Sequence, residues 1–172
     1  MFKFLSFIYT PIPISFDSRF DLPTSLERLN NGITQRRLLQ IPAETSVVGQ
    51  VSENNVVLKK VTPNVRNSFS LNFTGRFESI DNKIVLNGNF EMSTFVVAFV
   101  TVALLLSLLV TLGSMVALVV NHSANVSAWF VPLGGLAVGT GCYAITYIGY
   151  SISKSSDIPY ISNVIKQAFS RR

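Results

Sequence analysis

A long block without charged side chains constrains this chain more than any other feature. Residues 93–153 contain no Asp, Glu, Lys or Arg, although the whole chain has 14 basic and 9 acidic residues. Two apolar runs in the block, at about 94–120 and 128–152, exceed the roughly 20 residues that a membrane-spanning helix needs. The polar segment Asn121–Ser127 separates them. We therefore expect residues 93–153 to form a transmembrane helical hairpin.

Basic residues outside the block predict how the hairpin is oriented. The segment between the two runs has no Lys or Arg, whereas Lys83, Lys154 and Lys166 lie on the opposite side of the spans. By the positive-inside rule, this distribution places both termini in the cytoplasm. The predicted location is the inner (plasma) membrane, as a multi-pass protein.

Small residues form a stripe in the second run. Gly135, Gly139, Thr146 and Gly149 belong to this stripe, whose four-three spacing puts them on one helix face. Small residues let two membrane helices approach closely. The stripe predicts either contact between the two helices of one hairpin or association of several hairpins. The second interpretation would permit an oligomeric channel or transport component.

Residues 1–92 have the pattern of a cytoplasmic α+β module. Ile12, Ile14 and Phe16 alternate with polar or proline residues, as in a strand. The capping-box spacing of Thr24 and Glu27 predicts a short helix near 24–31, with a continuation to about residue 39 left open and residues 33–44 ambiguous. Four further runs, "SVVGQVS", "VVLKKV", "RNSFSLNFTGRFE" and "KIVLNGNFEM", read as strands. Together they predict a small antiparallel meander of about four strands, with one apolar and one polar face.

Residues 154–172 predict an amphipathic C-terminal helix. Asp157 is the expected N-cap, and Pro159 falls in the first turn. The apolar stripe of this helix is Ile161, Val164, Ile165 and Ala168. We expect the stripe to cover the aromatic face of the sheet, which is Phe69, Leu71, Phe73 and Phe77. The alternative places the helix on the membrane surface, with its basic residues at lipid headgroups.

The basic charge of the chain does not indicate nucleic-acid binding. Residues 1–92 carry ten Lys or Arg against eight Asp or Glu (+2), and residues 154–172 carry four against one (+3). Neither segment has the dense basic stripe that phosphate contacts require. Four basic residues near the polar side of the sheet are either a solvated surface or contacts for lipid headgroups or an acidic partner: Lys59, Lys60, Arg66 and Arg76.

The residue types that carry catalysis are sparse. His122 is the only histidine and Cys142 the only cysteine, so neither a metal constellation nor an intrachain disulfide is expected. The glycine-containing stretches lack the strand, helix and Lys of a phosphate-binding loop. We therefore expect neither a cofactor nor enzymatic activity.

The strand motifs "VVGQV", "RNSFSLNFTGRF" and "IVLNGNF", followed by a hairpin and a final helix, carry a family resemblance. The chain resembles small uncharacterised bacterial membrane proteins with V-x-G-x-V, N-S-F-x-P-x-F-x-G and L-x-G-x-F strands. Leu71 stands where those proteins often have proline. The resemblance implies the same architecture of strands, hairpin and final helix and a bacterial origin. It implies no particular activity.

These observations predict a non-catalytic cytoplasmic module that is held at the membrane by a hairpin inserted between its last strand and last helix. Its expected partners are the lipid bilayer and either another protein or further copies of itself. Two alternatives are kept. One is the oligomeric channel, and the other is a lipid- or small-ligand-binding module with an apolar groove between the sheet and the last helix.

Overall fold

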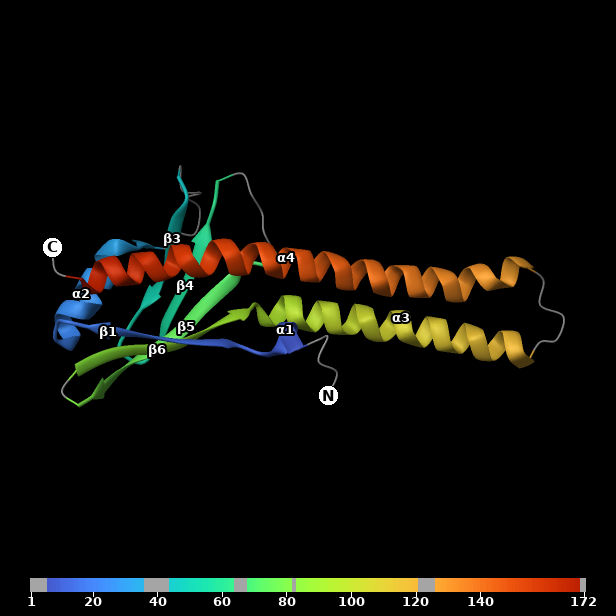
Figure 1. Ribbon diagram of the computed structural model, residues 1–172, viewed down its shortest axis with the longest axis horizontal. Helices are drawn as coiled ribbons and strands as arrows, with labels where there is room; N and C mark the ends of the chain where they lie inside the picture. Colours follow the sequence, from blue (N-terminus) through green and yellow to red (C-terminus); the bar gives the residue numbers. More distant parts are fainter. Residues whose placement is uncertain (1–5, 36–43, 64–67, 82, 121–125, 171–172) are drawn as a thin grey trace. The chain divides into compact units, whose positions relative to one another are not determined.

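The computed structural model describes residues 6–35, 44–63, 68–81, 83–120 and 126–170 (Figure 1). The chain divides into two compact units. The sheet unit combines Met1–Ser93 with Tyr150–Arg172, and the helical unit is Thr94–Gly149. The predicted α+β class is confirmed: the chain contains an antiparallel sheet, an N-terminal helix and two long apolar helices.

The sheet has six strands in the order β1-β6-β5-β4-β3-β2. Their bounds are β1 (Ile12–Ser18), β2 (Thr34–Gln35), β3 (Ser46–Val51), β4 (Val56–Val61), β5 (Leu71–Ile80) and β6 (Lys83–Met92). Strands β3 to β6 form the predicted antiparallel meander, and β1 pairs antiparallel with β6. Strand β2, in the segment that the sequence left ambiguous, makes a short parallel pair with β3.

The pairing register separates the sheet into two chemically different faces. Phe73 lies opposite Phe90 and Leu58, and Phe77 lies opposite Leu86, so their side chains share one face. We call this the covered face. Its buried apolar members are Phe16, Val47, Val56, Leu58, Leu71, Phe73, Phe77, Leu86, Phe90 and Met92. The Phe73 ring lies at the centre, with its centroid 6.0 Å from that of Phe16 and 5.3 Å from that of Phe90.

Two glycines make room for the Phe73 ring. Gly75 and Gly88 are directly opposite each other on β5 and β6. A Cβ atom at Gly88 would lie 2.5 Å from Cζ of Phe73, and one at Gly75 would lie 2.9 Å from the same atom. Because neither distance is tolerable, only glycine lets the ring lie against the two strands.

The predicted aromatic strand begins later than the sequence suggested. Phe69 lies in a turn and is half-buried, and β5 begins at Leu71. The backbone N–H of Leu71 donates to Oδ2 of Asp157. Because this N–H is used by a helix side chain, the β4–β5 ladder begins at Asn72, opposite Lys59.

Helix α1 (Ser6–Tyr9) precedes β1, and helix α2 (Leu22–Gly32) follows it. The predicted capping box is wrong, since the N-cap of α2 is Asp21. Pro23 explains the earlier start, because a proline in the first turn lacks only an N–H that the helix would leave unbonded. The helix ends at Gly32 because Ile33 is extended, so a continuation to Leu39 is also wrong.

Helix α4 (Phe130–Phe169) runs without a break through the boundary between the two units. A separate C-terminal helix with Asp157 as its N-cap is therefore wrong. Pro159 lies inside α4 and is exposed. Its missing N–H removes the partner of one backbone carbonyl, and on the exposed side water can replace that partner. Pro159 is thus tolerated instead of marking a helix start.

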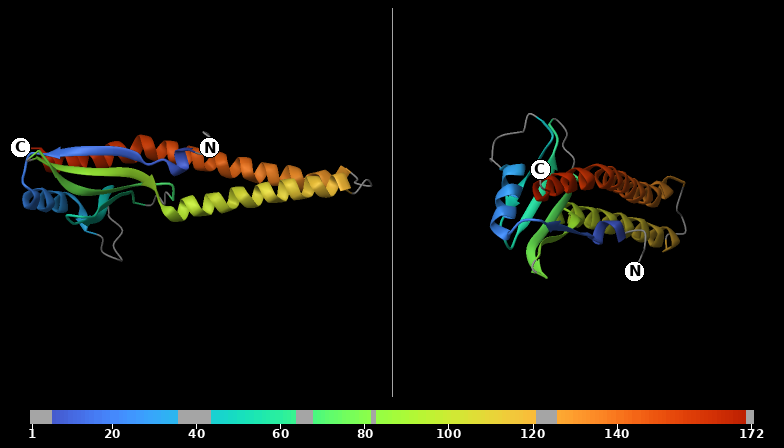
Figure 2. Two further views of the ribbon diagram at one scale, coloured as in Figure 1. Left: turned by 90° about the horizontal axis from the view of Figure 1, so that it is seen from below. Right: turned by 60° about the vertical axis from the view of Figure 1, so that its left-hand side comes forward.

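The last part of α4 packs on the covered face of the sheet (Figures 1 and 2). Ile161 and Ile165 are fully buried. The Phe169 ring centroid lies 6.0 Å from that of Phe77. Burying a large apolar side chain stabilises a fold by about 1.5–3 kcal/mol. This part of α4 is therefore integral to the core of the sheet unit.

The helical unit consists of α3 (Thr94–Val120), the short 3₁₀ helix η2 (Val126–Trp129) and the first part of α4. Both α3 and α4 are long and apolar enough to cross a membrane. Large apolar side chains cover the outside of α3, including Phe95 at 79% and Leu109 at 65% exposure. With 27 residues, α3 is about 40 Å long, compared with a hydrocarbon core of about 30 Å.

Candidate interaction site

The second face of the sheet, which we call the open face, presents mainly polar side chains. Thr74 of β5 lies opposite Asn89 of β6, and Arg76 lies opposite Asn87. Ser15 of β1 extends the second row, because it pairs with Asn87. Asn89, Arg76 and Ser15 are exposed. Strand alternation therefore builds a mainly polar surface over β1, β6 and β5.

A hydrogen-bonded triad fixes the charged centre of the open face. Nε of Arg76 donates to Oε1 of Glu78 at 2.7 Å, and Nδ2 of Asn87 donates to Oε2 at 2.6 Å. The hydrogen bond from Asn87 and then that from Arg76 lower the pKa of Glu78 below its ordinary value of 4.5. The Arg76 side chain is still 69% exposed. The triad therefore offers an oriented guanidinium to the surroundings.

The triad borders an open hollow of about 620 Å³. Residues of β1, β5 and β6 line the hollow, and the β3–β4 turn contributes Asn54 and Asn55. The backbones of Gly75 and Gly88 form part of the lining. The side chains around the hollow supply both hydrogen-bond donors and acceptors, together with the oriented guanidinium of Arg76.

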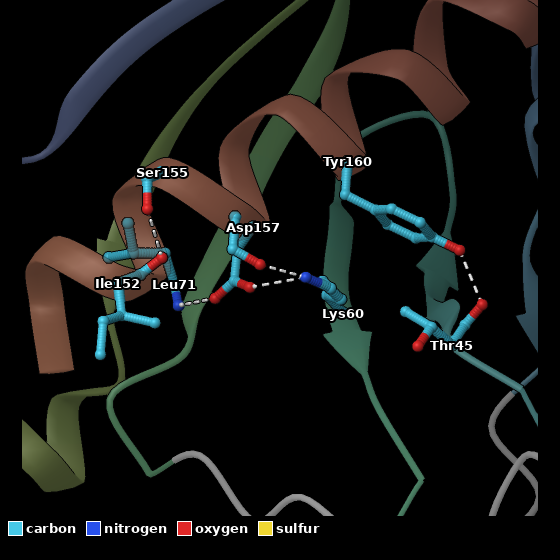
Figure 3. Close-up of polar contacts among 8 residues, drawn as sticks. Thr45, Lys60, Leu71, Ile152, Ser155, Asp157 and Tyr160 are labelled. Atoms are coloured by element: carbon cyan, nitrogen blue, oxygen red, sulfur yellow. Dashed lines mark hydrogen bonds and ion pairs between the residues drawn. The ribbon is translucent and has the colours of Figure 1, made fainter.

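A second polar cluster lies on the covered face, between β4 and α4 (Figure 3). Nζ of Lys60 is 3.5 Å from Oδ1 of Asp157 and also donates to Oγ of Ser156. The Lys60 and Asp157 side chains are only 15% and 7% exposed. Tyr160 packs its ring 5.3 Å from Nζ of Lys60 and donates its hydroxyl to the Thr45 carbonyl at 2.6 Å. This cluster ties α4 to β4 and to the start of β3.

The four basic residues singled out by sequence do not form one patch. Lys59 and Arg76 are exposed on the open face. Their Cα positions are offset by about 13 Å along the strands, because Arg76 lies four residues beyond Asn72, the partner of Lys59. Lys60 is on the covered face in the ion pair with Asp157. Arg66 lies outside the described residues.

The small-residue stripe of α4 meets α3 within the helical unit. Oγ of Ser107 donates to the carbonyl of Gly135 at 2.6 Å. A Cβ at Gly135 would lie 2.5 Å from Oγ1 of Thr111, and one at Gly139 would lie 2.4 Å from Oγ of Ser107. Thr146 is buried, with its hydroxyl donating to the Cys142 carbonyl, and Gly149 is half-buried.

The four stripe residues of the C-terminal segment differ in burial. Ile161 and Ile165 are fully buried, whereas Val164 and Ala168 are half-buried at the side. A Cβ at Gly32 would lie 3.9 Å from Cγ1 of Val164, so Val164 faces the end of α2.

Sequence reasoning missed the roles of Asp157 and Lys60, although both leave a signal. Asp157 stands four residues before Ile161, so it continues the buried row of Ile161 and Ile165. Lys60 follows Val56 and Leu58 in the inward alternation of β4. A charged residue at an inward position in each of two elements indicates a buried pair. Glu78 and Asn87 carried no comparable signal, because polar residues are ordinary on an open sheet face.

Within the described part of the chain, no group of three or more His, Cys, Asp or Glu side chains is placed to hold a metal ion. Comparison with known proteins finds no matching family model, no matching curated protein and no matching solved structure.

Proposed function

We propose that this protein is a non-catalytic membrane-anchored module that binds a protein partner through the open face of its sheet. The helical unit supplies the anchor, and the sheet unit lies in the cytoplasm. One observation carries the proposal: the sheet has one face filled by helices and a second face with an open, polar, hydrogen-bonded hollow.

The chemistry of the open face suits a polar protein surface. Amide side chains such as Asn87 and Asn89 donate and accept hydrogen bonds, so they can match backbone groups of a partner. Arg76 is exposed but oriented by Glu78. Arginine is enriched at protein interfaces, and a pre-oriented side chain loses less entropy on binding.

The proposed anchor rests on length, composition and charge. Helices α3 and α4 are long and apolar enough to cross a membrane. The absence of Lys and Arg between them, in residues 121–129, supports a cytoplasmic position for both termini at the inner membrane. The exposed apolar side chains of α3 would then contact lipid.

The anchor is tested by cysteine accessibility in a Cys142→Ser background. One variant carries Ser123→Cys, between the helices, and the other Ser170→Cys, after α4. We expect a membrane-impermeant maleimide to label position 123 on intact cells and position 170 only after permeabilisation. Labelling of position 170 on intact cells would contradict the proposed orientation, and release of the protein by alkaline extraction would contradict the anchor.

The open-face interface is tested by photocrosslinking from native membranes. A benzoylphenylalanine at Asn89, exposed beside the hollow, is compared with one at Gln167, exposed on α4. We expect a discrete crosslinked protein only from position 89, and its loss on Arg76→Ala substitution. Equal products from both positions, or a product unaffected by Arg76→Ala, would contradict the interface.

The packing of the helices does not favour the two alternatives. Gly135 and Gly139 meet Ser107 and Thr111 within one hairpin, which supports the anchor over a glycine-lined oligomer. The region between the sheet and α4 holds the buried side chains of Ile161 and Ile165, so an apolar ligand would have to displace them. Native mass spectrometry distinguishes the cases, since a channel predicts a defined ring and a lipid-binding groove predicts a co-purifying lipid.

A further inference from the structure

Both connections to the apolar helices leave the sheet unit at one end. Strand β6 ends at Met92, and α3 begins at Thr94. The sheet unit resumes at Tyr150, within α4. The Phe7 ring of α1 packs against Tyr150, with centroids 5.1 Å apart. We call the end formed by α1, Met92 and Tyr150 the exit end.

Strand pairing confirms that α1 belongs to this end. Ile12, the first residue of β1, lies opposite Phe90, close to the end of β6. The other end of the sheet carries the β5–β6 turn, where Ile80 pairs with Lys83. Figure 1 shows α1 and this turn at opposite ends of the strands. The ten residues of β6 separate the two ends by about 30 Å.

The side chains at the exit end are those that favour a lipid–water boundary. Ile8 is buried and holds α1 to the sheet unit, whereas Tyr9 is 44% exposed. Lys154 is exposed, with Nζ 6.0 Å from the Tyr150 ring centroid. Tyrosine is enriched at membrane interfaces, and lysine there extends its ammonium group toward water.

We propose that the exit end is a lipid-binding site, in which α1, Tyr150 and Lys154 lie in the phospholipid headgroup layer. The inference rests on the proposed membrane anchor. The short connection limits the distance between the exit end and the start of α3, because the two residues from Met92 to Thr94 reach at most about 7 Å. Each headgroup layer is about 5–8 Å thick. The start of α3 in the bilayer therefore keeps the exit end within reach of lipid.

Tryptophan reporters in lipid vesicles test this site. The full chain with Trp129→Phe receives one further substitution at a time: Tyr9→Trp at the exit end, Ile80→Trp at the far end or Leu109→Trp in α3. Tyr9 and Ile80 form a matched pair, since they are 44% and 45% exposed. The vesicles are phosphatidylcholine with bromine either near the headgroup or deep in the acyl chain, and bromine quenches tryptophan on contact.

We expect the Tyr9→Trp protein to lose more emission in lipid brominated near the headgroup than in deeply brominated lipid, while the Ile80→Trp protein is unaffected by either. Quenching in Leu109→Trp without quenching in Tyr9→Trp would overturn the lipid site and leave the anchor intact. Equal quenching in Tyr9→Trp and Ile80→Trp would also overturn it, because the whole sheet unit would then lie on the membrane. If the reporter at position 109 is not quenched, the membrane anchor itself is wrong.

Discussion

At the level of single residues, the Lys60–Asp157 pair holds α4 against the sheet. Asp157 forms the ion pair with Lys60 and also accepts a hydrogen bond from the backbone N–H of Leu71. Each partner is buried enough that water cannot fully replace the other. The pair therefore fixes the position of α4 in addition to neutralising two charges, since it aligns one turn of α4 with the start of β5.

We expect Asp157→Asn to destabilise the sheet unit. Asn keeps an acceptor for Leu71 N–H but leaves the Lys60 charge unpaired. Removing one partner of a buried pair costs about 3–5 kcal/mol, and the residual exposure of Lys60 (15%) reduces the expected cost to about 2–3 kcal/mol. Chemical unfolding of the detergent-solubilised protein measures this change.

A double-mutant cycle isolates the pair. The Lys60→Met/Asp157→Asn protein has no unpaired charge, so we expect it to be more stable than Asp157→Asn alone. Lys59→Met, one residue away on the open face, is the control and should change the free energy of unfolding by less than about 0.5 kcal/mol. If the separate effects of Lys60→Met and Asp157→Asn on the free energy of unfolding add up to that of the double substitution, the ion pair contributes no coupling.

The Glu78 triad leads to a pH-dependent prediction. Hydrogen bonds from Asn87 and Arg76 lower the folded-state pKa of Glu78 below 4.5. The ionised carboxylate therefore stabilises the triad above that ordinary pKa, and this contribution is lost as the pH falls through the lowered folded-state value. In an NMR titration of the Glu78 carboxyl carbon, we expect Asn87→Ala to raise the midpoint more than Arg76→Ala does. An unchanged midpoint in Asn87→Ala would contradict the triad, and Asn54→Ala is the control.

At the level of elements, the glycines of α4 provide a test with internal controls. Alanine at Gly135 or Gly139 places a methyl group against Thr111 or Ser107, whereas a Cβ at Gly134 or Gly141 has nothing within 4 Å. We expect Gly135→Ala and Gly139→Ala to lower the free energy of unfolding in detergent by about 1–3 kcal/mol through overpacking. The other two should be neutral or slightly stabilising, because alanine favours a helix. Four equal effects would show that the α3–α4 contact is not formed.

The sequence predicted those elements whose periodicity matches their burial. Strands β1 and β3 to β6 alternate polar and apolar residues because one face of the sheet is covered, and the pattern gives both their existence and their inner side. The start of α2 was missed because two start signals compete: the Thr24–Glu27 spacing suggests one position, and Asp21 followed by Pro23 selects another. Two-residue β2 is too short to have any periodicity.

The C-terminal segment shows why local signals can mislead. Asp157 and Pro159 have the spacing of a helix start, yet α4 continues through both. The choice is made by tertiary contacts, because Lys60 gives Asp157 a partner and the apolar rows before and after it lie on one continuous helix. The two partners are 97 positions apart in the chain (157 minus 60), beyond the range of any local pattern. The polar triad of the open face was missed for a different reason. Its members are close in the chain, but polar residues are ordinary on an open sheet face and give no signal of a specific contact.

At the scale of the whole molecule, one helix belongs to two environments. The first part of α4 meets α3 through glycine and serine, whereas its last part fills the core of the sheet unit with isoleucine and phenylalanine. The sheet unit is consequently built from two segments that are far apart in the chain. Its core is complete only when the chain has returned from the apolar helices.

This organisation predicts that the sheet unit can be separated from the anchor only together with its share of α4. Residues 1–93, joined by about ten Gly and Ser residues to 150–172, should be soluble and unfold cooperatively, because a flexible linker replaces the helical unit and keeps all buried side chains of the sheet unit. Residues 1–93 alone lose Ile161, Ile165 and Phe169, worth about 1.5–3 kcal/mol each. That sum is comparable with the total stability of about 5–15 kcal/mol of an ordinary domain. We therefore expect the shorter chain to lack a cooperative transition in circular dichroism, and an equally stable shorter chain would show that α4 is not part of the core.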